Sequence, residues 1–185
     1  LEVAARRYPQ RPAYVLLGRA LSYQQLHNEA EALAAWLRSQ GVQRGDRVAL
    51  FMQNLPQFVV AFYAAMRADA VVVPVNPMNK ADEFGHYITD PDTRVVITSA
   101  DLAGIVAQAN DALPAERRLR ALLVSQLADY LPAAIPDDLQ PAPAIARWLT
   151  TAVPLPEGAT AWADALVVGE AARGSLGPCS AGPDD

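Results

Sequence analysis

The sequence predicts an α/β fold with a doubly wound, mostly parallel sheet flanked by helices. Short apolar runs, each the length of a strand, alternate along the chain with segments whose apolar residues recur at helical spacing. These runs are almost continuously apolar, which is typical of parallel strands that helices cover on both faces. The right-handed crossover rule then winds the sheet in the doubly wound manner. A length of 185 residues predicts one domain.

The first elements are expected to be a hairpin and a helix. A β-prone apolar segment at 13–17 is followed by a turn at Gly18, which predicts the hairpin. Ser22 and Gln25 form a capping-box pattern, so a helix should begin there. Gly41 stands where a left-handed residue would end that helix. Four residues at helical spacing predict its buried face: Leu26, Ala30, Leu33 and Leu37.

The next unit repeats the alternation of strand and helix. The run 48–52 predicts a buried strand, and Asn54 is expected to cap a helix that accommodates Pro56 in its first turn. A second strand is expected at 70–75, closed by prolines. The side chains of the helix that should face inward are Phe58, Phe62, Ala65 and Met66.

A third helix should follow, with Asn79 as its cap and Asp82 and Glu83 in its first turn, where the helix dipole favours negative charge. Asp90, before a proline, is expected to stop it. Its apolar stripe should consist of Phe84, Tyr87 and Ile88. The remaining elements of this part are expected to be a strand at 93–98, a helix at about 102–112 and a strand at 119–124.

The character of the chain changes after Gln126. Residues 1–126 are expected to form the α/β subdomain, and 127–185 an irregular extension of the same domain, rich in Pro, Gly and Ala. Prolines interrupt this extension repeatedly, so only two short helices are expected, at 144–149 and 160–168. The last stretch, 169–185, is predicted to be a flexible loop or tail.

Composition and charge argue against several classes of function. The net charge of −5 disfavours nucleic acid as a partner. Cys179 is the only cysteine, so neither a disulfide within the chain nor a thiolate metal cluster is expected. His27 and His86 lie far apart in the sequence and have no acidic cluster around them. The longest apolar run is too short for a transmembrane segment. No signal peptide is expected, and the composition is typical of a cytoplasmic protein.

No residue is assigned a catalytic, cofactor-binding or metal-binding role from the sequence. Neither of the glycine-rich phosphate loops, Gly-x-Gly-x-x-Gly and Gly-x4-Gly-Lys-Ser/Thr, occurs. Ser99 is expected to cap the following helix, and Asp90 and Asp92 to be turn residues. His86 has no evident partner for acid–base chemistry, and Lys80, the only lysine, is expected to be solvated.

Five motifs follow one another in order between residues 1 and 101. They are Leu21-Ser22-Tyr23-Gln24-Gln25-Leu26, the segment 41–50 with Gly45-Asp46, Gln53-Asn54-Leu55-Pro56-Gln57-Phe58, the segment 66–77, and Glu83 to Asp90 with Arg94 to Thr98. Their order resembles that of one family, the acyl- and aryl-CoA synthetases, luciferases and peptide-synthetase adenylation domains. The sequence departs from the family's usual motifs at Gln25, where glutamate is common, and at Asp69, where glycine is common.

This resemblance implies a truncated amino-terminal subdomain of an adenylate-forming enzyme. Such enzymes use Mg-ATP to convert a carboxylic acid to an acyl-adenylate, and then pass the acyl group to a thiol, often coenzyme A. ATP, Mg and coenzyme A are therefore implied for the full-length parent, and none of them for this fragment, which is expected to be inactive. The family's phosphate loop lies downstream, and Gly182 to Asp185 resembles the approach to it. A truncated sheet should expose an apolar face, so self-association is expected.

Two other readings remain open. A peptide-synthetase adenylation domain is the first, although Asn76 favours the acyl-CoA ligase branch because aspartate is common there in peptide synthetases. The second is a Rossmann-like module that binds a small molecule or a protein and catalyses nothing. The missing glycine-rich fingerprint counts against dinucleotide binding by such a module.

Overall fold

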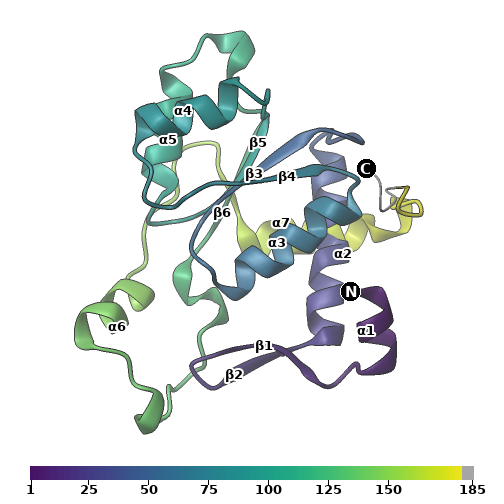
Figure 1. The fold of residues 1–185 in the computed structure, drawn as a ribbon, viewed down its shortest axis with the longest axis vertical. Coiled ribbons are helices and arrows are strands. Elements are labelled where there is room, and N and C mark those ends of the chain that lie inside the picture. The colour runs from purple at the N-terminus through teal and green to yellow at the C-terminus, as the bar shows by residue number, and fades with distance from the viewer. Residues whose placement is uncertain (181–185) are drawn as a thin grey trace.

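A five-stranded parallel sheet forms the centre of the protein. We describe a computed structural model, which covers residues 1–180. The strand order is β4-β3-β5-β6-β7, and all four neighbouring pairs are parallel. Figure 1 shows the sheet between two groups of helices, which confirms the predicted doubly wound α/β fold. The strands are β3 (Arg47–Phe51), β4 (Val71–Pro74), β5 (Val95–Ser99), β6 (Ala121–Ser125) and β7 (Thr160–Ala161).

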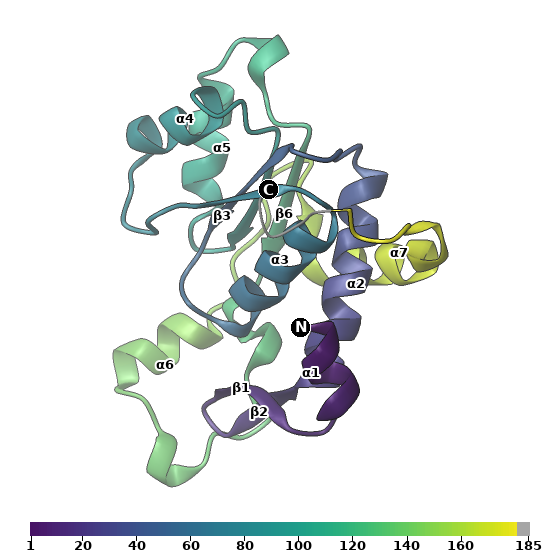
Figure 2. The same cartoon turned by 45° about the vertical axis from the view of Figure 1, so that its right-hand side comes forward.

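Helices cover both faces of this sheet. On one face lie α2 (Tyr23–Ser39), α3 (Pro56–Arg67) and α7 (Trp162–Ala172), over the larger buried cluster. On the other lie α4 (Ala81–Thr89) and α5 (Ala103–Asp111), over a smaller apolar cluster. Figure 2 shows α7 alongside α2, and the two helices are in contact. The near-continuous apolar runs of the strands are explained by this double cover.

The amino-terminal elements follow local signals in the sequence. The predicted hairpin forms from β1 (Pro12–Leu16) and β2 (Arg19–Ser22), preceded by a short helix, α1 (Glu2–Arg7), that the sequence analysis did not identify. The capping box is present: the Ser22 hydroxyl accepts from the Gln25 amide at 3.2 Å, and the Gln25 side chain accepts from the Ser22 amide at 2.9 Å. Gly41 has a φ of 79°, as expected for the residue that ends α2.

The other three predicted caps, at Asn54, Asn79 and Ser99, are wrong. Helix α3 has Leu55 as its N-cap, because the chain is still extended there, and the Asn54 carbonyl accepts from the Tyr14 hydroxyl at 2.8 Å. Helix α4 has Lys80 at this position instead of Asn79, and the Glu83 carboxylate accepts the Lys80 amide proton at 2.8 Å. Ser99 remains in β5, three residues before the N-cap of α5.

The inward face of α3 also differs from the prediction. Ala65 is buried, but Met66 is 47% exposed, and Phe58 and Phe62 are only partly buried at the margin of the core. Small side chains occupy the centre because α3 packs against both the sheet and α2, and close approach of two helices favours small residues at the contact. The fully buried apolar residues of α3 are Val60, Ala61, Ala64 and Ala65.

The carboxy-terminal extension contains more regular structure than the sequence indicated. The short helix predicted at 144–149 is present as α6 (Pro143–Thr150). The segment predicted to be a helix from 160 begins as β7 and continues as α7 to Ala172, so residues 169–172 are not part of a flexible tail. Gly182 to Asp185 lie outside the described residues. Four 3-10 helices are also described: η1 (Ala115–Arg117), η2 (Leu127–Tyr130), η3 (Asp137–Leu139) and η4 (Arg173–Ser175).

Candidate functional site at the carboxyl edge of the sheet

The strand order places a topological switch point between β3 and β5. The chain passes from β3 to β4 on one side, and then crosses to β5 on the other. In open α/β sheets, ligands bind beyond the carboxyl ends of the strands at such a point. The candidate site is therefore the edge formed by the ends of β3, β5 and β6, with the segments that follow them.

Three buried and uncharged polar side chains gather at this edge. Ser99 and Ser125 end β5 and β6 and stand opposite each other in the register. Gln57, on α3, is 1% exposed, and its amide nitrogen donates to the carbonyl of Gln126 at 2.9 Å. Among the described residues, neither serine hydroxyl nor the Gln57 side-chain oxygen has a hydrogen-bond partner. Such groups are normally paired with protein or water, so this edge retains unused hydrogen-bonding capacity.

The segment containing α6 covers part of this edge. The Trp148 indole nitrogen donates to an Asp101 carboxylate oxygen at 3.1 Å. The Gln126 side chain pairs with the backbone of Val153, donating at 2.8 Å and accepting at 3.1 Å. Leu149 completes the cover by packing with Leu55 and Leu127 in a small apolar cluster. These contacts bring α6, which begins 44 residues after the end of β5, back to the switch point.

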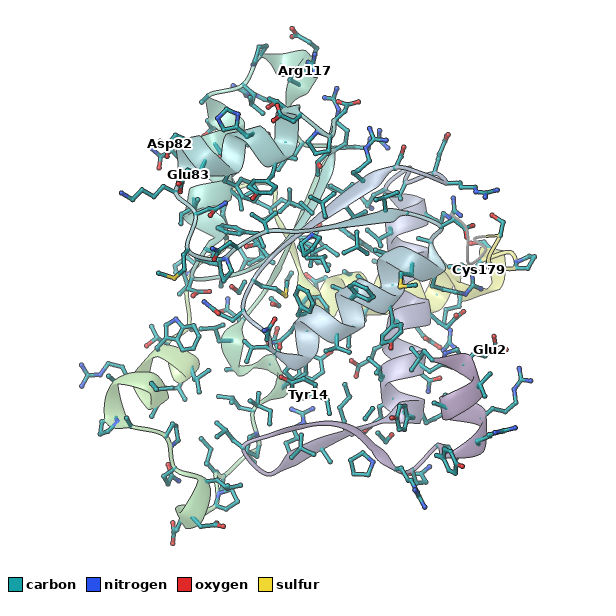
Figure 3. All side chains as sticks on the ribbon, viewed as in Figure 1. Glu2, Tyr14, Asp82, Glu83, Arg117 and Cys179 are labelled. Carbon is teal, nitrogen blue, oxygen red and sulfur yellow. The ribbon has the colours of Figure 1, made fainter. Side chains whose placement is uncertain are left out.

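Two cavities flank β4. The smaller has a volume of about 260 Å³ and is lined by residues that follow β3 and β4, including Asn54 and Asn76. The larger, about 1220 Å³, runs along β4 and α3 and reaches α1 and α2. Its lining includes Phe62, Met66 and Cys179. Figure 3 shows Cys179 beside the carboxyl-terminal end of α3, where its thiol is 3.1 Å from Asp69 Oδ1.

The side chains considered from the sequence are not brought together. His86 on α4 and Lys80, the N-cap of that helix, are exposed, and Ser99 is buried at the carboxyl edge. Asp92, with a φ of 54°, lies at the opposite edge and pairs with Arg94 at 2.9 Å. The expectation that this chain carries no catalytic residue stays a prediction. Gln57 and Ser125 were missed, although polar residues at the ends of neighbouring strands are a signal that could have identified the serine.

A second buried polar cluster joins α2, η2 and α7. The Tyr130 hydroxyl donates to the Glu29 carboxylate and accepts from the Trp162 indole nitrogen at 3.1 Å. Burial raises the pKa of Glu29, against the opposing effects of the Tyr130 hydrogen bond and the Arg19 charge. Burial also raises the pKa of Tyr130, and the neighbouring Glu29 raises it further. The cluster therefore keeps its tyrosine neutral and ties η2 to two helices.

Neither a cluster of metal-ligating side chains nor a membrane-spanning helix is present in the part of the chain that the structure describes. Residues 1–180 contain no group of three or more His, Cys, Asp or Glu side chains that could hold a metal ion. Every helix within the same residues is too short or too polar to cross a bilayer.

Comparison with known proteins identifies the family. A model of the family "AMP-binding enzyme" matches residues 1–165. A long-chain-fatty-acid–CoA ligase of Yersinia pestis is 31% identical over 134 residues, which are 72% of this chain and 23% of that protein. The chain thus spans about a quarter of the length of this curated relative.

Solved structures agree with this assignment. A benzoate CoA ligase from Burkholderia xenovorans LB400 has a TM-score of 0.61 and 28% identity, over 67% of this chain and 24% of that one. Coronafacic acid ligase from Pectobacterium brasiliense has a TM-score of 0.67 over 100% of this chain and 30% of that one. At 16% identity, the second likeness supports the fold alone. Because the family model covers most of its length, this chain belongs to the AMP-binding enzyme family.

Proposed function

We propose that this chain is the amino-terminal part of an acyl-CoA synthetase that activates a carboxylic acid with ATP and transfers the acyl group to coenzyme A. The observation that carries the proposal is the family match over residues 1–165, together with relatives named as CoA ligases. The names of the curated relatives favour a fatty acid as the substrate.

We also propose that the 185-residue chain is inactive by itself. Residues 1–180 contain no group of three or more His, Cys, Asp or Glu side chains that could hold a metal ion, and neither glycine-rich phosphate-loop motif occurs in the sequence. No step of the reaction is therefore assigned to a side chain of this fragment. Its contribution would be structural: the parallel sheet holds Ser99, Ser125 and Gln57 at the edge where ligands of α/β sheets bind.

Carboxylate-dependent exchange of labelled pyrophosphate into ATP tests both proposals. The chain and the product of its complete reading frame would be assayed with a series of fatty acids, benzoate and amino acids. We expect exchange with a fatty acid for the complete product, thioester formation when coenzyme A is added, and no exchange for the chain alone. Exchange by the chain alone would contradict its inactivity. Exchange only with an amino acid would support the peptide-synthetase alternative, and no exchange by the complete product would support the binding module.

We further propose that the isolated chain self-associates through the outer edge of β4. This strand pairs only with β3 in the sheet of residues 1–180, Val71 on it is 50% exposed, and the neighbouring Met66 is 47% exposed. Exposed strand edges pair readily with other chains. Sedimentation velocity should show a concentration-dependent dimer that Val71→Lys abolishes and that Val167→Lys, at an exposed position on α7, leaves intact. A monomer at all concentrations would disprove this proposal.

A further inference from the structure

Three arginines stand in a row at the amino edge of the sheet, opposite the candidate site. Arg47 begins β3, Arg94 directly precedes β5, and Arg120 directly precedes β6. The register pairs Val48 with Val95 and Val95 with Ala121, so the residues just before these positions are also neighbours. The Arg120 amide donates to the Arg94 carbonyl at 2.7 Å, which confirms this for one pair. Adjacent strands are about 4.8 Å apart, and like charges on neighbouring strands repel each other.

These arginines line a pocket of about 330 Å³ whose charge is unbalanced. Arg118 joins them from the segment before β6, and the acidic residues of the lining are Asp46 and Asp92. Four guanidinium groups and two carboxylates leave two positive charges in excess. Asp92 is 2.9 Å from Arg94 but 4.0 Å from Arg47. The Asp46 carboxylate accepts from the amide of Gln43 in its own turn.

The guanidinium groups are oriented mainly by backbone carbonyls, which leave their charge intact. Arg120 donates to the Gly41 carbonyl at 2.8 Å, and its side chain lies against the Gly41 Cα, where a Cβ would be 3.0 Å from the guanidinium. Arg118 donates to the carbonyls of Asp111 and Leu113, both at 3.3 Å. Carbonyl contacts of this kind reduce the freedom of a side chain without neutralising it. The arginines are therefore held in place while their charge remains available to an anion.

The size and chemistry of this pocket indicate a compact anion. Its volume is near the lower end of the range of about 300–1,000 Å³ for ligand pockets. Arginine binds phosphate oxygens through two parallel hydrogen bonds, and it keeps its charge at every physiological pH. An extended polyanion such as nucleic acid requires a broad basic surface, whereas the whole chain has a net charge of −5.

We propose that the pocket formed by Arg47, Arg94, Arg118 and Arg120 binds a phosphate-bearing anion of the size of inorganic phosphate or pyrophosphate. The bound anion would neutralise the excess charge at the amino ends of β3, β5 and β6. This site lies at the edge of the sheet opposite the candidate functional site, and the inference does not depend on the proposed synthetase activity.

Isothermal titration calorimetry of the 185-residue chain with pyrophosphate and with inorganic phosphate, at low ionic strength, tests this site. We expect saturable binding with a dissociation constant of about 1 mM or tighter. The double variant Arg118→Gln/Arg120→Gln should bind about a hundredfold more weakly, because each substitution removes a charge-assisted contact. Tighter binding of pyrophosphate would assign the site to diphosphates, and equal binding would assign it to single phosphate groups.

Arg117→Gln is the matched control. It removes one positive charge from the neighbouring η1, at the position labelled at the top of Figure 3, but Arg117 does not line the pocket. Its affinity should stay within about twofold of that of the unmodified chain. An equal loss of affinity in Arg117→Gln and in the double variant would show non-specific attraction and overturn the proposal. Absence of binding up to about 10 mM pyrophosphate would overturn it as well.

Asp92→Asn should change the affinity for pyrophosphate in the opposite direction to the double variant. This test does not require the double variant to fold. Asparagine tolerates the left-handed conformation of this residue, φ 54°, and the substitution removes the carboxylate that pairs with Arg94. The affinity for pyrophosphate should rise by about threefold or more, since the excess positive charge increases. Unchanged or weaker binding by this variant would contradict the proposed site.

Discussion

The two faces of the sheet are held together by different kinds of contact. Under α4 and α5, the buried cluster consists of apolar side chains, with the rings of Phe51 and Phe84 4.6 Å apart. Under α2 and α7, the apolar core is joined by a buried polar cluster of Glu29, Tyr130 and Trp162. Here α7 also approaches α2 so closely that a Cβ on Gly169 would be 1.9 Å from the Ala32 carbonyl oxygen.

The two faces therefore differ in what stabilises them: the volume of buried apolar side chains on one, and the geometry of specific contacts on the other. The α4–α5 face depends on how much apolar surface is buried, and such packing tolerates changes that preserve volume. The α2–α7 face depends on hydrogen bonds and on a close backbone approach, for which a small change in shape is enough to disrupt the contact. The second face also carries α7, whose last residues were predicted to belong to a flexible tail.

The largest effect is expected on the apolar face. Phe84→Ala should lower the free energy of unfolding by about 3–5 kcal/mol, because it removes a fully buried ring and leaves a cavity. Urea denaturation followed by circular dichroism measures this change. His86→Ala, at an exposed position on the same helix, should change stability by less than about 0.5 kcal/mol. A similar loss in both variants would mean that helix propensity, and not packing, dominates.

A smaller but more localised effect is expected from Gly169→Ala. The added methyl group meets the backbone of α2, so α7 must move away at a cost of about 2–3 kcal/mol. Hydrogen exchange should accelerate in α7 and remain unchanged in α4 and α5. Gly174→Ala is the control, because nothing lies within 4 Å of a Cβ at that position. Unchanged protection of α7 would show that the two helices separate readily.

Tyr130→Phe tests the buried polar cluster. Loss of the hydroxyl leaves the Glu29 carboxylate and the Trp162 indole without this partner, and we expect a loss of about 1–3 kcal/mol in unfolding free energy. The matched variant Tyr87→Phe removes a hydroxyl from the helix that covers the apolar face. Thermal unfolding should show almost no change for that variant. An equal loss of stability in Tyr130→Phe and Tyr87→Phe would mean that the buried polar cluster does not distinguish the two faces.

The smallest effect concerns the pH dependence of stability. Burial raises the pKa of Glu29 above its ordinary value of 4.5, so the folded state favours the protonated carboxyl group. This contribution to stability is complete below the unfolded pKa and is lost as the pH rises through the folded pKa. Relative to Glu29→Gln, the unmodified chain should therefore lose stability as the pH rises from 4 to 7.

Denaturation of both proteins at several pH values measures this difference. Glu157→Gln, at an exposed position, should follow the unmodified chain at every pH. A constant difference between the unmodified chain and Glu29→Gln would contradict the raised pKa of this residue.

Sequence signals predicted elements well where the structure is local. The capping box at Ser22, the left-handed residue Gly41 and the apolar stripe of α4 depend on residues within one or two helical turns, and all three are present. The caps at Asn54 and Asn79 failed because each helix begins one residue later than the residue type suggested. Boundaries of this kind depend on where the preceding strand and loop lead the chain.

The residues of the candidate site were harder to predict from the sequence than the fold was. Ser99 was noted as a helix cap, whereas the structure places it beside Ser125 at the ends of two strands. Gln57 gave no signal at all, because a polar residue on a helix is normally solvated. Only the register of β5 against β6 and the packing of α3 bring these three groups into one buried region.

The sequence by itself determined the family, the alternation of strands and helices, and the parallel sheet, because motif order and hydrophobic periodicity are properties of the chain. The tertiary structure alone decided that α7 packs on α2 through Gly169, that β7 extends the sheet, and that three arginines meet at its amino edge. These features depend on contacts between residues far apart in the chain. Such contacts form only when the strand register and the helix crossings are set, and neither leaves a local pattern in the sequence.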